Sequence, residues 1–192
     1  MPDLQEHTEV RTTRLRLRGL CVEDAEDVHL IRSRPEAMLY SHNGPEASIE
    51  HTQGWIRGCL SRPNVYNFAI ELLSPEDYVD KTDDKASRHK VIGLVGAVGA
   101  PEIGYMFHPD FWGRGLATEA LQAFMPLYWQ QFRSEFDFAS AKIDPANGQS
   151  KRVLQKCGFS LEDRKIKSFG NPSLGLRDIE IYRLQRPAAV CQ

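Results

Sequence analysis

The chain has 192 residues, of which 41% are hydrophobic and 26% charged, and its formal net charge is −2. This composition fits one globular domain with a sizeable core and provides no basic field for holding nucleic acid. No apolar run approaches the roughly 20 residues of a membrane span, and the polar, acidic N-terminus resembles neither a signal peptide nor a transit peptide. The four cysteines are scattered without a CxxC pattern, so we expect no metal site, no disulfide framework and a cytoplasmic location.

The N-terminal region predicts a short leader followed by a strand. Residues 1–11 are expected to form a flexible leader. Residues 13–20 alternate between apolar and basic side chains, which predicts a half-buried strand. The arginine row Arg14, Arg16 and Arg18 fits either a solvated outer face or a nucleic-acid stripe, and charge patterning favours the solvated face.

Two helices and three strands are predicted next. Residues 22–38 form an amphipathic pattern with an acidic first turn, and the helix is expected to end before Pro35. Residues 48–62 predict a second helix, which Ser48 can cap. The expected strands are 65–73, 90–99 and 102–107. The polar segment 74–89 is interpreted as a long, mobile hairpin loop.

The C-terminal half alternates between helices and strands. A helix is expected over 116–132, with Pro126 kinking it or ending its regular part. The remaining elements are a strand at 135–144, a helix at 149–157 that Gly158 terminates, strands at 160–169 and 177–184 around the loop 169–175, and a frayed tail at 185–192. This order predicts an α+β fold in which about seven strands form a mixed, mostly antiparallel sheet with helices on both faces.

The segment FWGRGLATEA at 111–120 lies between a predicted strand and a predicted helix. Unpaired backbone N–H groups at a helix N-terminus and the helix dipole both favour an anion, so the segment is a candidate phosphate or pyrophosphate site. The dinucleotide fingerprint fails because its third glycine position is Thr118, and no Gly-Lys-Ser/Thr sequence of a P-loop occurs. A tight strand–helix connection with glycines for turning is the plain structural alternative.

A second motif, NGQSKRVLQKCGF at 147–159, follows the glycine-rich loop. Together with FWGRGLATEAL and the order of elements, it resembles the GNAT N-acetyltransferases, and most of all the RimJ/RimL-type branch that acetylates protein N-termini and related small amines. The resemblance covers roughly residues 12–184, which we expect to form a single domain. The GNAT loop begins with Gln or Arg, whereas this chain has Trp112 there, a departure also usual in that branch.

The resemblance implies that acetyl-CoA is the co-substrate and that backbone amides of residues 114–118 hold its pyrophosphate. Large side chains at positions 115 or 117 would block that approach. It also implies that a backbone N–H on a bulged strand binds the thioester oxygen, and Gly104 is the expected position of the bulge. The predicted cofactor-binding residues are Tyr105, Phe107, Trp112, Gly113, Arg114, Gly115, Leu116, Ala117, Thr118 and Asn147.

Two residues are candidates for proton transfer. Glu102, at the start of its strand, is where related enzymes place a carboxylate that takes the proton of the amine, although it also fits a solvent-facing strand position. Leu154 occupies the position where many GNATs have a Tyr that protonates the leaving thiolate, so Ser150 is the nearest substitute. Ser150 and Asn147 also fit purely structural places at the start of their helix.

The expected partners are acetyl-CoA and an amine acceptor, with no nucleic acid, membrane or metal. The expected reaction is direct transfer of an acetyl group to a primary amine of a protein N-terminus or a small molecule. Because Leu154 cannot replace the usual Tyr, a catalytically inactive acyl-CoA-binding sensor is the alternative. The oligomeric state is left open between monomer and homodimer.

Overall fold

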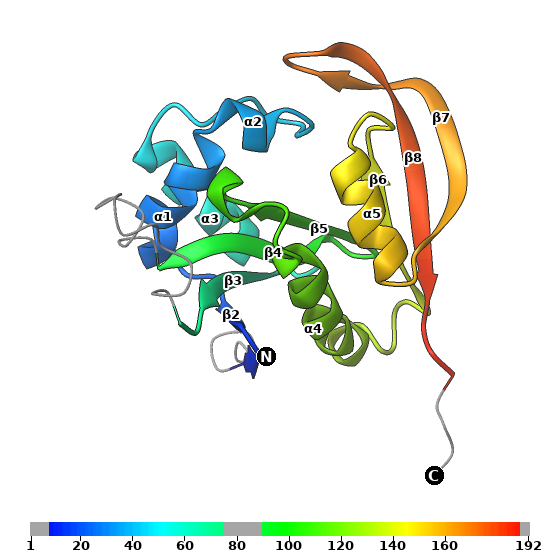
Figure 1. The fold of residues 1–192 in the computed structure, drawn as a ribbon, viewed down its shortest axis with the longest axis horizontal. Helices are drawn as coiled ribbons and strands as arrows, with labels where there is room; N and C mark the ends of the chain where they lie inside the picture. The colour runs from blue at the N-terminus through cyan, green and yellow to red at the C-terminus, as the bar shows by residue number, and fades with distance from the viewer. Residues whose placement is uncertain (1–7, 75–89, 189–192) are drawn as a thin grey trace.

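The computed structural model describes residues 8–74 and 90–188, which form one mixed sheet flanked by helices (Figure 1). The sheet has the strand order β1-β2-β3-β4-β5-β6-β8-β7. Its strands are β1 Glu9–Arg11, β2 Leu15–Gly19, β3 Tyr66–Leu72, β4 Val91–Gly99, β5 Glu102–Phe107, β6 Phe138–Ile143, β7 Ser160–Asn171 and β8 Gly175–Gln185. Every neighbouring pair is antiparallel except β5 and β6, which are parallel. The predicted α+β fold is confirmed, with one strand more than expected.

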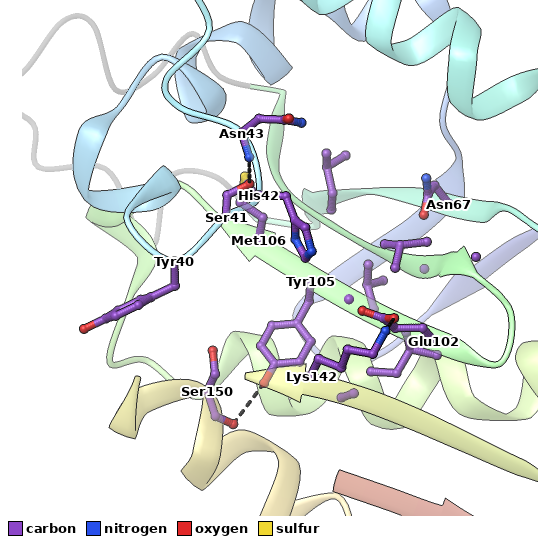
Figure 2. Close-up of a pocket in the computed structure, with 18 of the residues that line it drawn as sticks. Tyr40, Ser41, His42, Asn43, Asn67, Glu102, Tyr105, Met106, Lys142 and Ser150 are labelled. Carbon is purple, nitrogen blue, oxygen red and sulfur yellow. Dashed lines mark hydrogen bonds and ion pairs between the residues drawn. The ribbon is translucent and has the colours of Figure 1, made fainter. Parts of the chain in front are cut away.

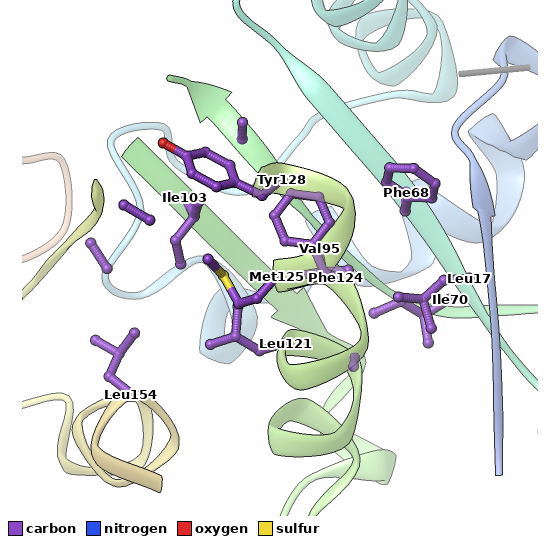
Figure 3. Packing of buried hydrophobic residues seen from close by; sticks show 14 of the residues in the cluster. Leu17, Phe68, Ile70, Val95, Ile103, Leu121, Phe124, Met125, Tyr128 and Leu154 are labelled. Carbon is purple, nitrogen blue, oxygen red and sulfur yellow. The ribbon is translucent and has the colours of Figure 1, made fainter. Parts of the chain in front are cut away.

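Helices cover both faces of the sheet. They are α1 Ala25–Arg32, α2 Pro35–Met38, α3 Ile49–Leu60, α4 Leu116–Gln131 and α5 Gly148–Lys156, with short 3₁₀ turns η1 Val22–Asp24 and η4 Pro109–Phe111. Because side chains alternate along a strand, Phe68 and Ile70 of β3 pack in the cluster under α4, whereas Ala69 joins α1 and α3 on the opposite face (Figure 3). None of the helices in the described residues is long and apolar enough to cross a membrane.

Several boundaries differ from the predictions because distant contacts decide them. The final residues of the expected leader form β1, which pairs with β2. The segment 22–38 is divided into η1, α1 and α2, and its second helix begins at Pro35, where a proline fits the first helical turn. Pro126 does not end α4, which continues to Gln131. In the expected frayed tail, Arg186 is anchored by hydrogen bonds to the carbonyls of Trp129, Phe132 and Phe136.

The arginines of β2 form ion pairs and are not an open basic stripe. Arg16 pairs with Glu9 at 2.6 Å and with Glu71 at 3.0 Å, and Arg18 pairs with Asp24 at 2.6 Å. Carboxylates that neutralise these guanidinium groups remove the charge that a phosphate backbone would need, which argues against the nucleic-acid stripe, while the side chains of Arg14 and Arg16 remain 34% and 31% exposed. The predicted loop at 74–89 falls almost wholly outside the described residues.

Candidate active site

The site is built on the point where β5 and β6 separate. Within the described residues these parallel strands share one residue pair, Glu102 with Ser140. The indole Nε1 of Trp112 donates to the carbonyl of Phe107 at 2.9 Å on the cleft side of β5, while His108 N–H points back to Ile92 of β4. Because successive peptide groups alternate in direction along a strand, the N–H groups of Tyr105 and Phe107 also face the cleft.

In the pairing of β4 with β5 the irregular position lies on β4, and the expectation of a bulge at Gly104 is wrong. The pairing of β4 with β5 shifts between Ala97 and Gly99, which leaves Val98 as the extra residue. A Cβ built on Gly104 would lie 3.1 Å from Cγ1 of Val98, so the glycine gives space to that side chain. The small residue in the sequence therefore identified the neighbour of the bulge and not the bulge itself.

The glycine-rich loop adopts the backbone conformation expected of an anion site. Gly113 and Gly115 have φ values of 74° and 78°, and Gly115 is the N-cap of α4. These left-handed conformations favour glycine, and the first N–H groups of α4 follow directly. The loop lines a cavity of about 670 Å³ that extends between Phe107 and the start of α5. This volume lies in the range of small-molecule and cofactor sites.

An ion pair between Arg14, which directly precedes β2, and Glu119 of α4 holds this loop in place. Arg14 binds Glu119 through Nε at 2.7 Å and through Nη2 at 2.5 Å, and its Nη1 donates to the carbonyl of Arg114 at 2.9 Å. Burial acts to raise the pKa of Glu119, but hydrogen bonds from Thr12 and Arg14 outweigh it and leave the pKa below its ordinary value. Sequence reasoning missed this pair because the two residues lie 105 positions apart.

Three of the expected cofactor-binding side chains make contacts within the protein itself. Trp112 binds Phe107 as described, and Leu116 is buried with 1% of its surface exposed. The guanidinium of Arg114 lies over the ring of Phe111, 5.7 Å from its centroid. On this side the cavity is lined by Trp112, the two glycines and the partly exposed Ala117 and Thr118.

The opposite wall of the cleft is the start of α5. Asn147 caps this helix, because its Oδ1 accepts from the N–H of Ser150 at 3.1 Å. The hydroxyl of Tyr105 crosses the cleft and donates to the carbonyl of Ser150 at 3.0 Å (Figure 2). Burial raises the pKa of Tyr105, so this hydroxyl remains protonated. Two cationic side chains that the sequence analysis missed, Arg152 and Lys156, line the same cavity from successive turns of α5.

A second cavity of about 550 Å³ lies on the face of the sheet covered by α1 and α3. Glu102 lines it and accepts from Nζ of Lys142 at 2.6 Å (Figure 2). The two cavities share Ala37, Tyr40, Tyr105, Met106, Asn147 and Ser150 as lining residues. The two cavities are therefore neighbours along β5 and α5, with the Tyr105–Ser150 hydrogen bond between these elements, and Glu102 and Ser150 line one cavity.

The remaining candidates for covalent or metal chemistry fit poorly. Cys157 sits against the carbonyl of Thr118, and burial raises its pKa to about 11, which keeps the thiol protonated near neutral pH. Leu154 is fully buried in the core and does not reach the cleft. In the portions of the chain that are described, no cluster of three or more His, Cys, Asp or Glu side chains could hold a metal ion.

Comparison with known families decides the identity of this site. The model of the acetyltransferase (GNAT) domain matches residues 14–160, which includes the loop, β5 and the start of α5. The chain belongs to the GNAT acetyltransferase family. Its relatives include YkkB of Bacillus subtilis (strain 168), which is 28% identical over 169 residues, with 86% of this chain and 92% of YkkB covered. This GNAT protein is accordingly an N-acetyltransferase.

Solved structures of the family share the fold at low sequence identity. RimL, a ribosomal L7/L12 α-N-protein acetyltransferase in complex with coenzyme A, has a TM-score of 0.74 at 20% identity, with 93% of this chain and 98% of RimL covered. Spermidine N-acetyltransferase from Vibrio cholerae, in complex with CoA and spermine, has a TM-score of 0.70 at 16% identity, with 91% and 97% covered. At these identities the likeness concerns the fold alone.

Proposed function

We propose that this N-acetyltransferase moves an acetyl group from acetyl-CoA directly to a primary amine of a protein N-terminus or a small molecule. The observation that carries the proposal is the pair of adjoining cavities that share Tyr105, Asn147 and Ser150, one lined by the positive-φ loop and the other by Glu102. The motifs at 111–121 and 147–159, which resemble those of the RimJ/RimL-type branch, support an enzyme of that kind. Three free cysteines in the described segments fit a location in the cytoplasm.

The residues of the first cavity fit the parts of CoA. Backbone N–H groups of residues 114–118 would hold the pyrophosphate, and Arg152 and Lys156 would add positive charge on the other wall. The N–H groups of Tyr105 and Phe107 are available to the extended pantetheine arm and to the thioester oxygen. When bound, acetyl-CoA supplies an activated carbonyl. Asn147 fixes the first turn of α5 and thereby the wall that the thiol end contacts.

The second cavity is where the acceptor amine binds and where the groups assigned to proton transfer lie. A protonated amine has no lone pair for attack, so Glu102 takes its proton, directly or through one water molecule. Lys142 pairs with that carboxylate at 2.6 Å and so fixes its position in the cavity. Ser150, which lines both cavities, is assigned to the thiolate that leaves. Direct attack is favoured over an acyl-enzyme because the thiol of Cys157 is protonated and contacts a carbonyl.

Release of free thiol from acetyl-CoA in the presence of an amine panel tests the proposal. We expect release that depends on the amine and on its concentration, with the N-acetyl product detected by mass spectrometry. Binding of CoA by calorimetry without release for any amine would instead identify an acyl-CoA-binding sensor. The reason for that alternative is that Leu154, which is buried, has no hydroxyl to protonate the leaving thiolate.

A further inference from the structure

Both carboxylates that line the acceptor cavity are already neutralised within the protein. Glu102 binds Lys142 at 2.6 Å. The carboxylate of Asp144 accepts hydrogen bonds from Nε of Arg177 at 2.7 Å and from Nη2 of the same side chain at 3.1 Å. The hydrogen bond from Arg177 is the main reason that the pKa of Asp144 lies below its ordinary value. A second ammonium group on the acceptor would therefore meet carboxylates whose charge is balanced.

A cation whose hydrogen bonding is incomplete lies near α3, at the end of this cavity. The side chain of Arg32 is 4% exposed, and its guanidinium carbon lies 3.9 Å from the centroid of the Trp55 ring. One nitrogen, Nη2, pairs with Glu46 at 2.6 Å, but the buried Nε has no hydrogen-bond partner. Such an N–H group carries a desolvation penalty until an acceptor reaches it.

A second arginine approaches from the end of α3. Nε of Arg62 donates to the carbonyl of Gly58 at 3.0 Å, and its Nη2 lies 3.7 Å from Sγ of Cys59. Among the residues that the structure describes, no carboxylate pairs with Arg62. Both guanidinium groups act on the thiol of Cys59. Burial raises the pKa of this thiol, and the positive charges of Arg62 and Arg32 lower it.

From these contacts we infer that Arg32 and Arg62 form an anion subsite in the acceptor cavity and that the acceptor is a small amine bearing a carboxylate. This inference rests on the proposed acetyl transfer. The amine points toward Glu102 and the adjoining cavity, while the carboxylate lies between the two arginines. The two guanidinium groups carry two positive charges, and Glu46 balances one of them. One positive charge is therefore left to bind the carboxylate of the substrate. A polyamine would place a second cation there and is disfavoured by like-charge repulsion.

Binding of product analogues tests the subsite without relying on turnover. The probes are N-acetyl-L-amino acids and the matching N-acetyl-L-amino acid amides, titrated by calorimetry into the full chain saturated with CoA. A hydrogen bond to a charged group corresponds to roughly a 10- to 100-fold change in affinity, and of the two arginines Arg32 is buried whereas Arg62 is exposed. We expect at least tenfold tighter binding of the carboxylates than of their amides.

Substitutions of the two arginines, compared with a control arginine, separate the effect of the subsite from general effects of charge. Arg62→Gln should remove most of the preference for the carboxylate, and Arg32→Lys should reduce it, since Lys cannot present the same planar donors. Arg57→Gln is the matched control, because Arg57 is an exposed arginine of α3, the helix that ends just before Arg62, and does not line the cavity. Circular dichroism and CoA affinity confirm that each variant folds.

The outcomes distinguish this inference from the proposed function. Equal affinity for acids and amides, or a preference that Arg62→Gln leaves unchanged, overturns the subsite. Thiol release with polyamines in place of amino acids also overturns it and leaves the acetyl transfer intact. Carboxylate binding that depends on Arg62, without thiol release for any amine, upholds the subsite and refutes the transfer.

Discussion

Replacing Gly115 by Val tests the loop that we assign to the pyrophosphate. The residue has a φ of 78° and caps α4, and a β-branched side chain is a strong outlier in that conformation. The left-handed conformation costs roughly 1–2 kcal/mol for a residue with a Cβ. The added Cβ would lie 3.6 Å from Nη2 of Arg14, an ordinary contact, so strain and not a clash sets the cost within the protein.

The same side chain would stand in the path of the anion. Loss of one or two hydrogen bonds from backbone N–H groups to a phosphate, at about 1.5–3 kcal/mol each, predicts a CoA dissociation constant that rises at least tenfold. Urea unfolding measures the first effect and calorimetry with CoA the second. Gly54→Ala is the control, because Gly54 lies in α3 with no atom within 4 Å of its built Cβ, and it should stabilise the protein by up to about 1 kcal/mol. Unchanged CoA affinity in a folded Gly115→Val protein would refute the loop assignment.

Three further substitutions address the chemistry and its support. Glu102→Gln should lower kcat by roughly 10²–10⁴-fold, measured by thiol release, because the base is removed while the CoA site is untouched. Ser150→Ala should lower kcat in the same assay and leave the dissociation constant of CoA within about twofold, since its backbone groups remain in place. Glu119→Gln should weaken the loss of unfolding free energy that accompanies a fall in pH on the acid side. The folded pKa of Glu119 is depressed, so its contribution is complete above the unfolded pKa and is lost as pH falls through the folded value.

Each of these has a result that contradicts its reasoning. A kcat for Glu102→Gln within threefold of wild type would assign the base to another group or to water. A Ser150→Ala enzyme with normal kcat would give Ser150 only its structural place in α5. Urea unfolding of Glu119→Gln at pH 7 and at acid pH should show a deficit at neutrality that narrows as the wild-type carboxylate is protonated. Equal deficits at both pH values would mean that the charge of Glu119 is not what stabilises the loop.

Local patterns were sufficient for most elements of the fold. The alternation of Leu15 and Leu17 predicted β2, and Ser48 and Asn147 were correctly expected as caps of α3 and α5. Gly158 ends α5 with a φ of 86°, as expected. These features depend on a few neighbouring residues, and the physical rules that govern them are short-range.

The errors arose where partners distant in sequence decide the structure. Glu9 joins a strand because its carboxylate and backbone meet β2, which no property of residues 1–11 signals. The bulge at Val98 depends on the register between β4 and β5. The same holds within the site, because Glu102 was predicted as a candidate but its contact with Lys142 was not. Ion pairs between strands require the order of the sheet, and the sequence pattern does not supply it.

The single residue pair between β5 and β6 has a consequence for how the protein behaves at high concentration. The N–H groups of Tyr105 and Phe107 would normally make β5 an open strand edge, and such edges recruit strands from other chains and start aggregation. Here Asn147 and Ser150 face that edge across the cavity, and Trp112 closes it at Phe107. The unpaired backbone of β5 therefore faces a cavity wall of this same chain, which shields it from pairing with a strand of a second chain.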